Sequence, residues 1–152
     1  MQISISLHEL PPPLRKFLAV FLITLSLAYL LGLGYVYYNT SMTYKGVSED
    51  LRGSETEMKF EKPVGEMFQT VHNHMFGLSI TFLLTGTIFF FSSMQNGLIK
   101  TFFLTEPLVS VILSFGSFWL IRFVSAQWAI LLFISGIFMA LGFCIQVIYS
   151  LY

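Results

Sequence analysis

The sequence has few charged residues and almost no cysteine. Charged residues make up 11% of its 152 residues, whereas a typical soluble domain has about 25%. Eight basic and eight acidic side chains give a formal net charge of zero, so the chain lacks the basic surface that nucleic-acid binding requires. The single cysteine, Cys144, excludes an intrachain disulfide and a cysteine-based zinc or iron–sulfur site.

Long apolar runs take the place of charged surface. Hydrophobic residues make up 55% of the chain, and 17 residues are phenylalanine. A helix needs about 20 apolar residues to cross the hydrocarbon core of a membrane. Four stretches have about this length: residues 17–38, 75–94, 102–121 and 128–150. The sequence therefore predicts a single all-α domain over residues 1–152, a four-helix integral membrane bundle. Short connections between the later spans predict antiparallel neighbours, with both termini on one side.

One long polar segment, residues 39–71, separates the first two apolar runs and carries ten charged side chains. Ser48 and Gly53 have the residue types that begin and end a short helix, and Pro63 suits the first turn of the second long helix. Because the charges are of mixed sign, the segment either folds back at the membrane surface or forms a solvated loop. Its predicted partner-docking residues are Arg52, Glu55, Glu57 and Lys59.

Two histidines, His72 and His74, lie where the polar segment meets the second apolar run. Histidine is a common metal ligand, and ionisable side chains are rare at membrane depth, so both are predicted to bind a cofactor. Haem is the first candidate, and copper or another metal is the second, with Met75 as an additional soft ligand. Residues i and i+2 of a regular helix point about 200° apart, so a shared site needs a distorted backbone. The alternative is interfacial histidines that bond loop carboxylates and bind no cofactor.

Glu106 is the intramembrane acid of the sequence. A carboxylate buried in a membrane must pair or become protonated, because burying it as an isolated charge is costly. Glu106 is therefore a candidate for a proton path or an ion site. The alternative is structural, since Thr105, Glu106 and Pro107 together have the residue types of a helix N-terminus, where a carboxylate meets the positive end of the helix dipole.

The region between the first two apolar runs resembles a group of small bacterial membrane proteins. These proteins have about four spans, a charged loop after the first span, and an H-x-H sequence at the head of the second. The resemblance covers residues 44–88, and it rests on residues 52–55 (RGSE) and 70–74 (TVHNH). It implies no particular activity, but it implies that the loop and the histidines act together.

Three functions fit these features. The first is a small membrane subunit of a larger electron-transfer or respiratory complex, with haem or a metal at His72 and His74. The second is a non-enzymatic accessory or assembly protein that binds no cofactor and docks a partner through its charged loop. A small transporter or channel is third, because few polar groups lie in the spans. The sequence contains no catalytic motif, so an autonomous enzyme is not expected.

Basic residues at the first span predict the orientation. Arg15 and Lys16 directly precede the first apolar run, and basic residues in this position usually stay in the cytoplasm. Both termini are therefore predicted to be cytoplasmic in a bacterial inner membrane, which places the loop and the histidines in or near the periplasm. The expected partners are membrane lipid and either other membrane subunits or a second copy of the chain, and no nucleic acid is expected.

Overall fold

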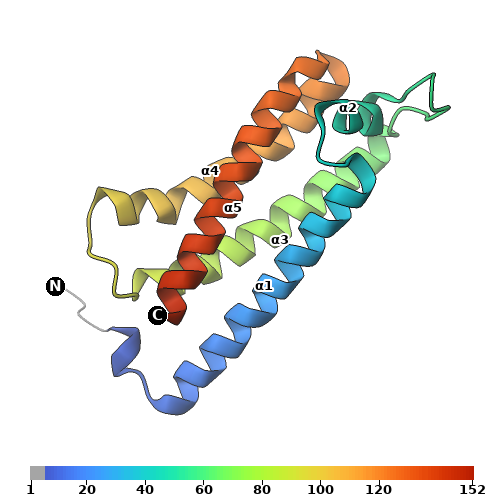
Figure 1. The fold of residues 1–152 in the computed structure, drawn as a ribbon. Coiled ribbons are helices and arrows are strands. Elements are labelled where there is room, and N and C mark those ends of the chain that lie inside the picture. The colour runs from blue at the N-terminus through green and yellow to red at the C-terminus, as the bar shows by residue number, and fades with distance from the viewer. Residues whose placement is uncertain (1–5) are drawn as a thin grey trace.

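The computed structural model describes residues 6–152 as an all-α structure. These residues contain one isolated β-bridge and no strand. The prediction of an all-α fold is confirmed. The helices are α1 (Pro12–Thr40), α2 (Tyr44–Arg52), α3 (Val64–Phe90), α4 (Leu98–Phe123) and α5 (Ala129–Leu151), with 3-10 turns η1 (Leu7–Glu9) and η2 (Ala126–Trp128) (Figure 1).

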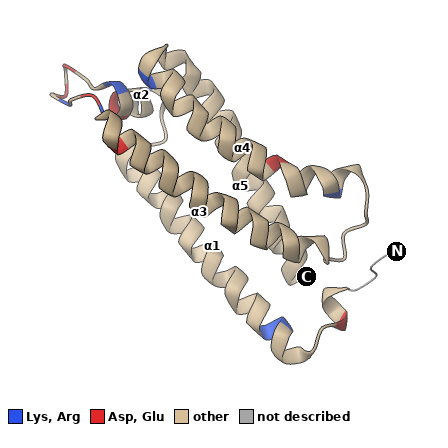
Figure 2. Cartoon of the chain, turned by 180° about the vertical axis from the view of Figure 1, so that it is seen from behind, with Lys and Arg blue, Asp and Glu red and all other residues tan. Residues whose placement is uncertain are grey.

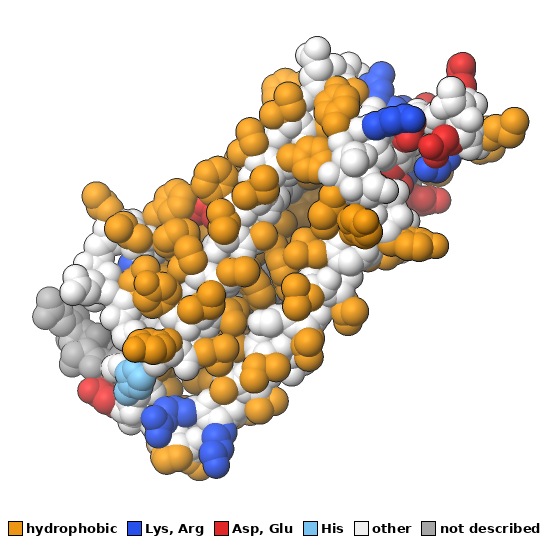
Figure 3. All heavy atoms as spheres, viewed as in Figure 1, with side chains coloured by type: hydrophobic (Ala, Val, Ile, Leu, Met, Phe, Trp, Pro, Cys, Tyr) orange, Lys and Arg blue, Asp and Glu red, His pale blue; other side chains and the backbone are white. Residues whose placement is uncertain are grey.

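Four of the helices, α1, α3, α4 and α5, are long and apolar enough to cross a membrane. They contain between 23 and 29 residues, which corresponds to about 35 to 44 Å at 1.5 Å per residue and exceeds the hydrocarbon core of ~30 Å. Hydrophobic side chains cover much of the visible face of the bundle (Figure 3). The chain is thus an integral membrane bundle with four spans.

α1, α3, α5 and the later part of α4 extend along a common direction, whereas the first turns of α4 bend away from the bundle (Figure 1). Both ends of the described chain lie at the same end of the bundle. We call this the terminal end. The opposite end, which we call the capped end, carries α2 and the loop of residues 53–63. α4 and α5 form a closely packed antiparallel hairpin, and α3 packs against both. α1 lies on the outside of the bundle, and Leu22 is its single buried residue.

The polar segment is more helical than the loop predicted over residues 39–71. Ser41 adopts a left-handed conformation that ends α1. The Thr43 side chain accepts a hydrogen bond from the amide N–H of Gly46 and caps α2, so the predicted helix start at Ser48 is wrong and Ser48 lies inside α2. Gly53 ends α2 with φ of +79°, and a Cβ there would lie 2.8 Å from the Lys59 carbonyl oxygen, so the turn requires glycine. α3 then begins directly after Pro63, as its residue type predicted, and ends four residues earlier than the predicted span.

Two apolar clusters hold the bundle together. The larger lies between the spans and is built from Leu22, Phe82, Val111, Phe115, Phe143 and Val147. The smaller lies at the capped end, where Val47 and Leu51 of α2 pack against Ile121 and Ala129 of the α4–α5 hairpin. α2 therefore has one apolar face, and this face closes the bundle while its charged face points outward.

Candidate functional site

His72 and His74 lie on α3 with different neighbours. The His72 ring is exposed and stacks on Phe76, with 6.3 Å between the ring centroids. The His74 ring lies 5.5 Å from the ring of Phe115, which belongs to the larger apolar cluster. His74 Nδ1 is 2.9 Å from the carbonyl oxygen of Thr70. The regular helix does not direct the two imidazoles toward one point, so a cofactor site here has one histidine of this chain rather than two.

The described residues do not bring a set of metal-binding side chains together around Met75. Met75 is partly buried and packs against the larger apolar cluster. Within residues 6–152, no three His, Cys, Asp or Glu side chains come close enough to hold a metal ion together. Four of the six carboxylates of the polar segment, Glu49, Asp50, Glu57 and Glu61, pair instead with basic side chains at the capped end.

Those basic side chains fix α2 and the loop to the membrane helices. Arg52 Nη1 donates a hydrogen bond to the carbonyl oxygen of Ile121 at 2.8 Å, and thereby satisfies a carbonyl in the last turn of α4. Arg122 forms an ion pair with Glu61 at 2.7 Å, and Lys62 pairs with Asp50 at 3.0 Å. Most of the charged residues gather at this end of the molecule (Figure 2). Of the predicted docking residues, Arg52 therefore serves to attach the loop.

The loop itself forms a short hairpin beyond α2. Ser54 and Lys59 exchange two backbone hydrogen bonds of 2.9 Å, and Glu55 and Glu57 are exposed in the turn between them. Met58 and Phe60 are 90% and 95% exposed, although both are large and apolar. The hairpin projects away from the bundle at the capped end (Figure 1). The predicted docking segment thus carries apolar as well as charged side chains at its tip.

An ion pair orders the charged side of this tip. Lys59 Nζ lies 2.8 Å from Glu57 Oε2. The hydrogen bond from Lys59 lowers the pKa of Glu57, and the same bond raises the pKa of Lys59. Because the pKa of Glu57 is depressed in the folded hairpin, the contribution of the pair is present above the ordinary glutamate value of 4.5 and is lost as the pH falls through the lowered value.

Pro107 lies inside α4 and not at a helix N-terminus, because α4 begins at Leu98. The structural interpretation of Glu106 and Pro107 is therefore wrong. Proline has no N–H to bond the carbonyl four residues earlier, which leaves the carbonyl of Phe103 free. Gln146 of α5 donates its Nε2–H to this carbonyl at 2.8 Å, and its Oε1 accepts a hydrogen bond from Thr85 of α3 at 2.5 Å. One buried side chain thus joins three spans.

Glu106 lies beside this junction. Its Oε1 accepts a hydrogen bond from Ser110, whereas its Oε2 is buried and has no hydrogen-bond partner among the described residues. Gly142 of α5 lies against the same turn, and a Cβ on Gly142 would be 2.5 Å from Pro107 Cγ and 3.0 Å from Glu106 Oε2. The close approach of α4 and α5 here thus depends on glycine, a usual feature of membrane helix packing.

Sequence reasoning missed the Gln146 junction. The signal was present, because Gln146 is the only amide side chain in the last apolar run and Pro107 must free a carbonyl in the preceding one. The sequence could not supply the register of α5 against α4, which places Gln146 at the depth of the freed carbonyl. Lys100 was likewise counted only as a charge, yet it is buried and its Nζ donates to the carbonyls of Ser92 and Met94.

The arrangement of four apolar spans and a polar cap defines an integral membrane protein of the all-α class. A protein-family model, Aq_1264_TM, described as a transmembrane helical domain, matches residues 41–152. This match covers α2 to α5 and most of the chain, and the chain belongs to this family. Comparisons with curated proteins and with solved structures gave no match.

Proposed function

We propose that the protein is a non-enzymatic accessory subunit that docks a partner protein through the hairpin of residues 53–63. The observation that carries the proposal is that the hairpin is attached to the helices at its base, while its tip exposes apolar side chains. The Arg122–Glu61 ion pair and the Arg52 hydrogen bond attach the base to α4, and the Lys62–Asp50 pair joins the loop to α2. Met58 and Phe60 remain almost fully exposed. Ordering a loop costs conformational entropy, and a pre-ordered apolar tip reduces that cost on binding.

The tip has the composition of a small protein-binding surface. Apolar anchors, including aromatic side chains and methionine, are enriched at protein interfaces and supply much of the binding energy. Here Met58 and Phe60 lie beside Glu55, Glu57 and Lys59, whose charges would add specificity. The partner we propose is a membrane protein with an apolar surface outside the bilayer, next to this chain.

Site-specific photocrosslinking in native membranes tests the docking proposal. A photoreactive residue at position 58 or 60 is expected to give one discrete crosslinked protein. The matched control is position 45 on α2, because the Lys45 side chain is 74% exposed at the same end of the molecule. Crosslinks to lipid alone, or the same crosslinked proteins from all three positions, would contradict the proposal.

Substitution tests the contribution of each part of the tip. Met58→Ser with Phe60→Ser removes the apolar anchors without changing charge, and the crosslinked partner is expected to be lost from co-purification. Charge reversal at Glu55 and Glu57 is expected to weaken co-purification while the bundle stays folded, since both carboxylates are exposed. Undiminished co-purification of the partner with the first variant would remove the apolar tip from the interface.

A second candidate is a haem- or metal-binding subunit of an electron-transfer complex, and the orientation of His74 favours it. A metal-ligating histidine usually donates its other ring N–H to a carbonyl or carboxylate. The contact between His74 Nδ1 and the Thr70 carbonyl has this form and leaves Nε2 available. His72 has different neighbours, so the second ligand would be a methionine, a tyrosine, water or a side chain of another subunit.

An absorbance spectrum and metal analysis of gently purified protein test the second candidate. If His74 ligates haem, His74→Ala is expected to abolish the reduced-minus-oxidised spectrum, while His72→Ala leaves it unchanged. A colourless, metal-free protein that retains its partner would eliminate this candidate and leave the docking proposal standing.

We also propose that the capped end faces the periplasm of a bacterial inner membrane, with both termini in the cytoplasm. Four of the five basic side chains at the capped end form ion pairs with carboxylates. All ion pairs of residues 6–152 lie at that end, so Arg15 and Lys16 at the terminal end have no carboxylate side chain within ion-pair distance. Unpaired basic residues beside the first span favour a cytoplasmic terminal end.

A further inference from the structure

The N-terminal segment folds back under the bundle and builds a cavity at the terminal end. The amide N–H of Leu7 donates to the carbonyl of Phe91 at 3.0 Å, just beyond α3. Ser6 and Glu9 stabilise the η1 turn through a capping box. The cavity has a volume of about 420 Å³, and it lies between η1, the first turns of α1, the end of α3 and the last turn of α5.

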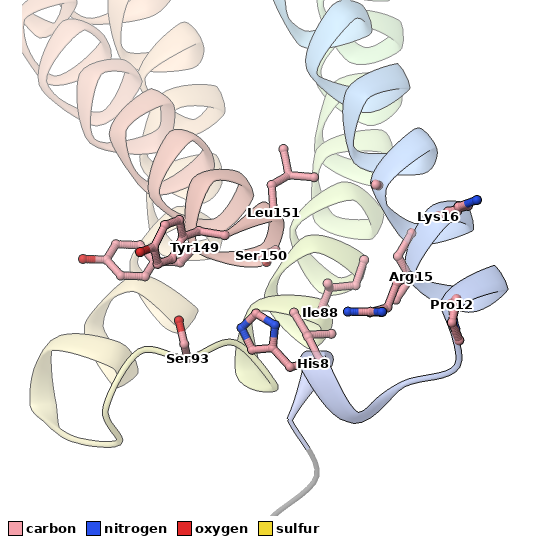
Figure 4. A pocket seen from close by; sticks show the side chains of 13 residues that line it. His8, Pro12, Arg15, Lys16, Ile88, Ser93, Tyr149, Ser150 and Leu151 are labelled. Carbon is pink, nitrogen blue, oxygen red and sulfur yellow. The ribbon is translucent and has the colours of Figure 1, made fainter.

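The cavity has basic side chains in its lining and no acidic side chain. His8, Arg15 and Lys16 line it, and none of its lining residues is Asp or Glu. Figure 4 shows the Arg15 guanidinium extending toward the His8 ring, with Ser93 across from them, whereas Lys16 points away. A guanidinium offers five N–H donors and no acceptor. Among the described residues, every ion pair lies at the other end of the bundle, so Arg15 is available to an outside anion.

The remainder of the lining is apolar and continues along the spans. Leu18, Ala19, Ile88 and Leu151 face the cavity from three different helices. Arg15 is also the residue type that lies at the boundary between hydrocarbon and headgroups, because it directly precedes an apolar run. A ligand that fits this lining has an anionic head and an apolar body, and it reaches the site from within the membrane.

We infer that this cavity binds the headgroup of an anionic phospholipid, with Arg15 and His8 on the phosphate and the acyl chains against the apolar lining. Arginine binds phosphate through charge-assisted, often bidentate hydrogen bonds. Basic pockets between membrane helices on the cytoplasmic side are suited to such lipids. The bound lipid joins α1 to α3 and α5, which matters because α1 has few buried side chains of its own.

The test measures binding of phosphatidylglycerol and phosphatidylcholine to the full chain by native mass spectrometry. Phosphatidylglycerol is expected to bind more tightly, and Arg15→Gln is expected to raise its dissociation constant about tenfold, as the loss of one charge-assisted contact implies. Lys16→Gln is the matched control, because it removes the same charge from the next residue, whose side chain points away from the cavity. It should raise the constant less than about threefold.

A second variant keeps the test informative if Arg15→Gln disturbs folding. Ala19→Phe partly fills the cavity without changing charge, and it is expected to weaken phosphatidylglycerol binding as well. Equal binding of the two lipids, or equal effects of the Arg15 and Lys16 variants, would overturn the inference in favour of general attraction to a charged surface. Equally tight binding of free glycerol 3-phosphate would overturn it in favour of a soluble phosphate ligand.

Discussion

At the scale of single residues, Gln146 compensates for the hydrogen bond that Pro107 removes. In a membrane no water is present to satisfy a freed carbonyl, so helices tolerate proline only when a neighbour supplies a donor. Gln146 supplies it from α5 and is fully buried. Its other amide atom is bonded by Thr85, so the side chain is held from two sides.

A double-mutant cycle tests this compensation. Gln146→Leu is expected to lower the free energy of unfolding by about 1 to 2 kcal/mol, because it leaves the Phe103 carbonyl without a donor and removes the bond from Thr85. The Thr85 hydroxyl keeps its bond to the Thr81 carbonyl. Pro107→Ala restores the N–H that bonds the Phe103 carbonyl, so the same substitution should cost less in that background. The measurement is unfolding in mixed detergent micelles. Strictly additive effects would show that Gln146 and Pro107 are not coupled.

Gly142 provides a second test on the same pair of helices. Gly142→Ala places a methyl group against the Pro107 ring and is expected to destabilise the bundle by about 1 to 3 kcal/mol. Gly136→Ala is the matched control on α5, since a Cβ there has no other atom within 4 Å. The control should be neutral or slightly stabilising because alanine favours helix. Similar melting temperatures for both variants would argue against the close packing at Pro107.

At the scale of elements, α2 and the hairpin depend on α4 for their position. Arg52 donates a hydrogen bond to the last turn of α4, and Glu61 pairs with Arg122 of α4. Leu51 is buried against α4 and α5. These contacts join segments about 60 to 70 residues apart in sequence. The cap is therefore expected to respond as a unit when one attachment is removed.

Arg52→Ala is expected to release the cap while the spans remain folded. The side chain bonds carbonyls at a helix end, where a cation also interacts favourably with the helix dipole. Hydrogen exchange in residues 44–63 should accelerate by about fivefold or more, which corresponds to about 1 kcal/mol of local stability. Lys45→Ala is the control, because Lys45 is exposed and its pair with Glu49 spans one turn of α2. Equal exchange in both variants would mean that the apolar face of α2 alone holds the cap.

At the scale of the whole molecule, the two ends differ in how their charges are satisfied. At the capped end four of the five basic residues pair with carboxylates, whereas the terminal end has Arg15 and Lys16 beside a cavity and without such partners. This asymmetry connects three proposals: partner docking at one end, lipid binding at the other, and a cytoplasmic terminal end. Of these proposals, the orientation in the membrane can be tested by a single labelling experiment.

Cysteine labelling tests the orientation. In a Cys144→Ser background, Thr56→Cys marks the hairpin and Asn96→Cys marks the turn between α3 and α4; both positions are exposed. In cells with an opened outer membrane, a membrane-impermeant maleimide is expected to label position 56 at once and position 96 only after the inner membrane is permeabilised. The reverse pattern would place the termini in the periplasm.

The sequence by itself determined the class of the protein. Runs of about 20 apolar residues must form helices in a membrane, because only a helix satisfies the backbone within one segment. The same logic predicted the helix start at Pro63 and the helix end at Gly53, since proline and glycine act through local backbone geometry. These features depend on residues close together in the chain.

Only the tertiary structure decided which polar groups meet. Local residue types suggested that Glu106 and Pro107 began a helix, but α4 extends nine residues further toward the N-terminus and places both beside α5. The pairing of Gln146 with the Phe103 carbonyl and of Arg122 with Glu61 likewise depends on the depth and rotation of packed helices. Periodicity gives the face of a helix but not its register against a neighbour, because register is set by the packing of side chains from distant segments.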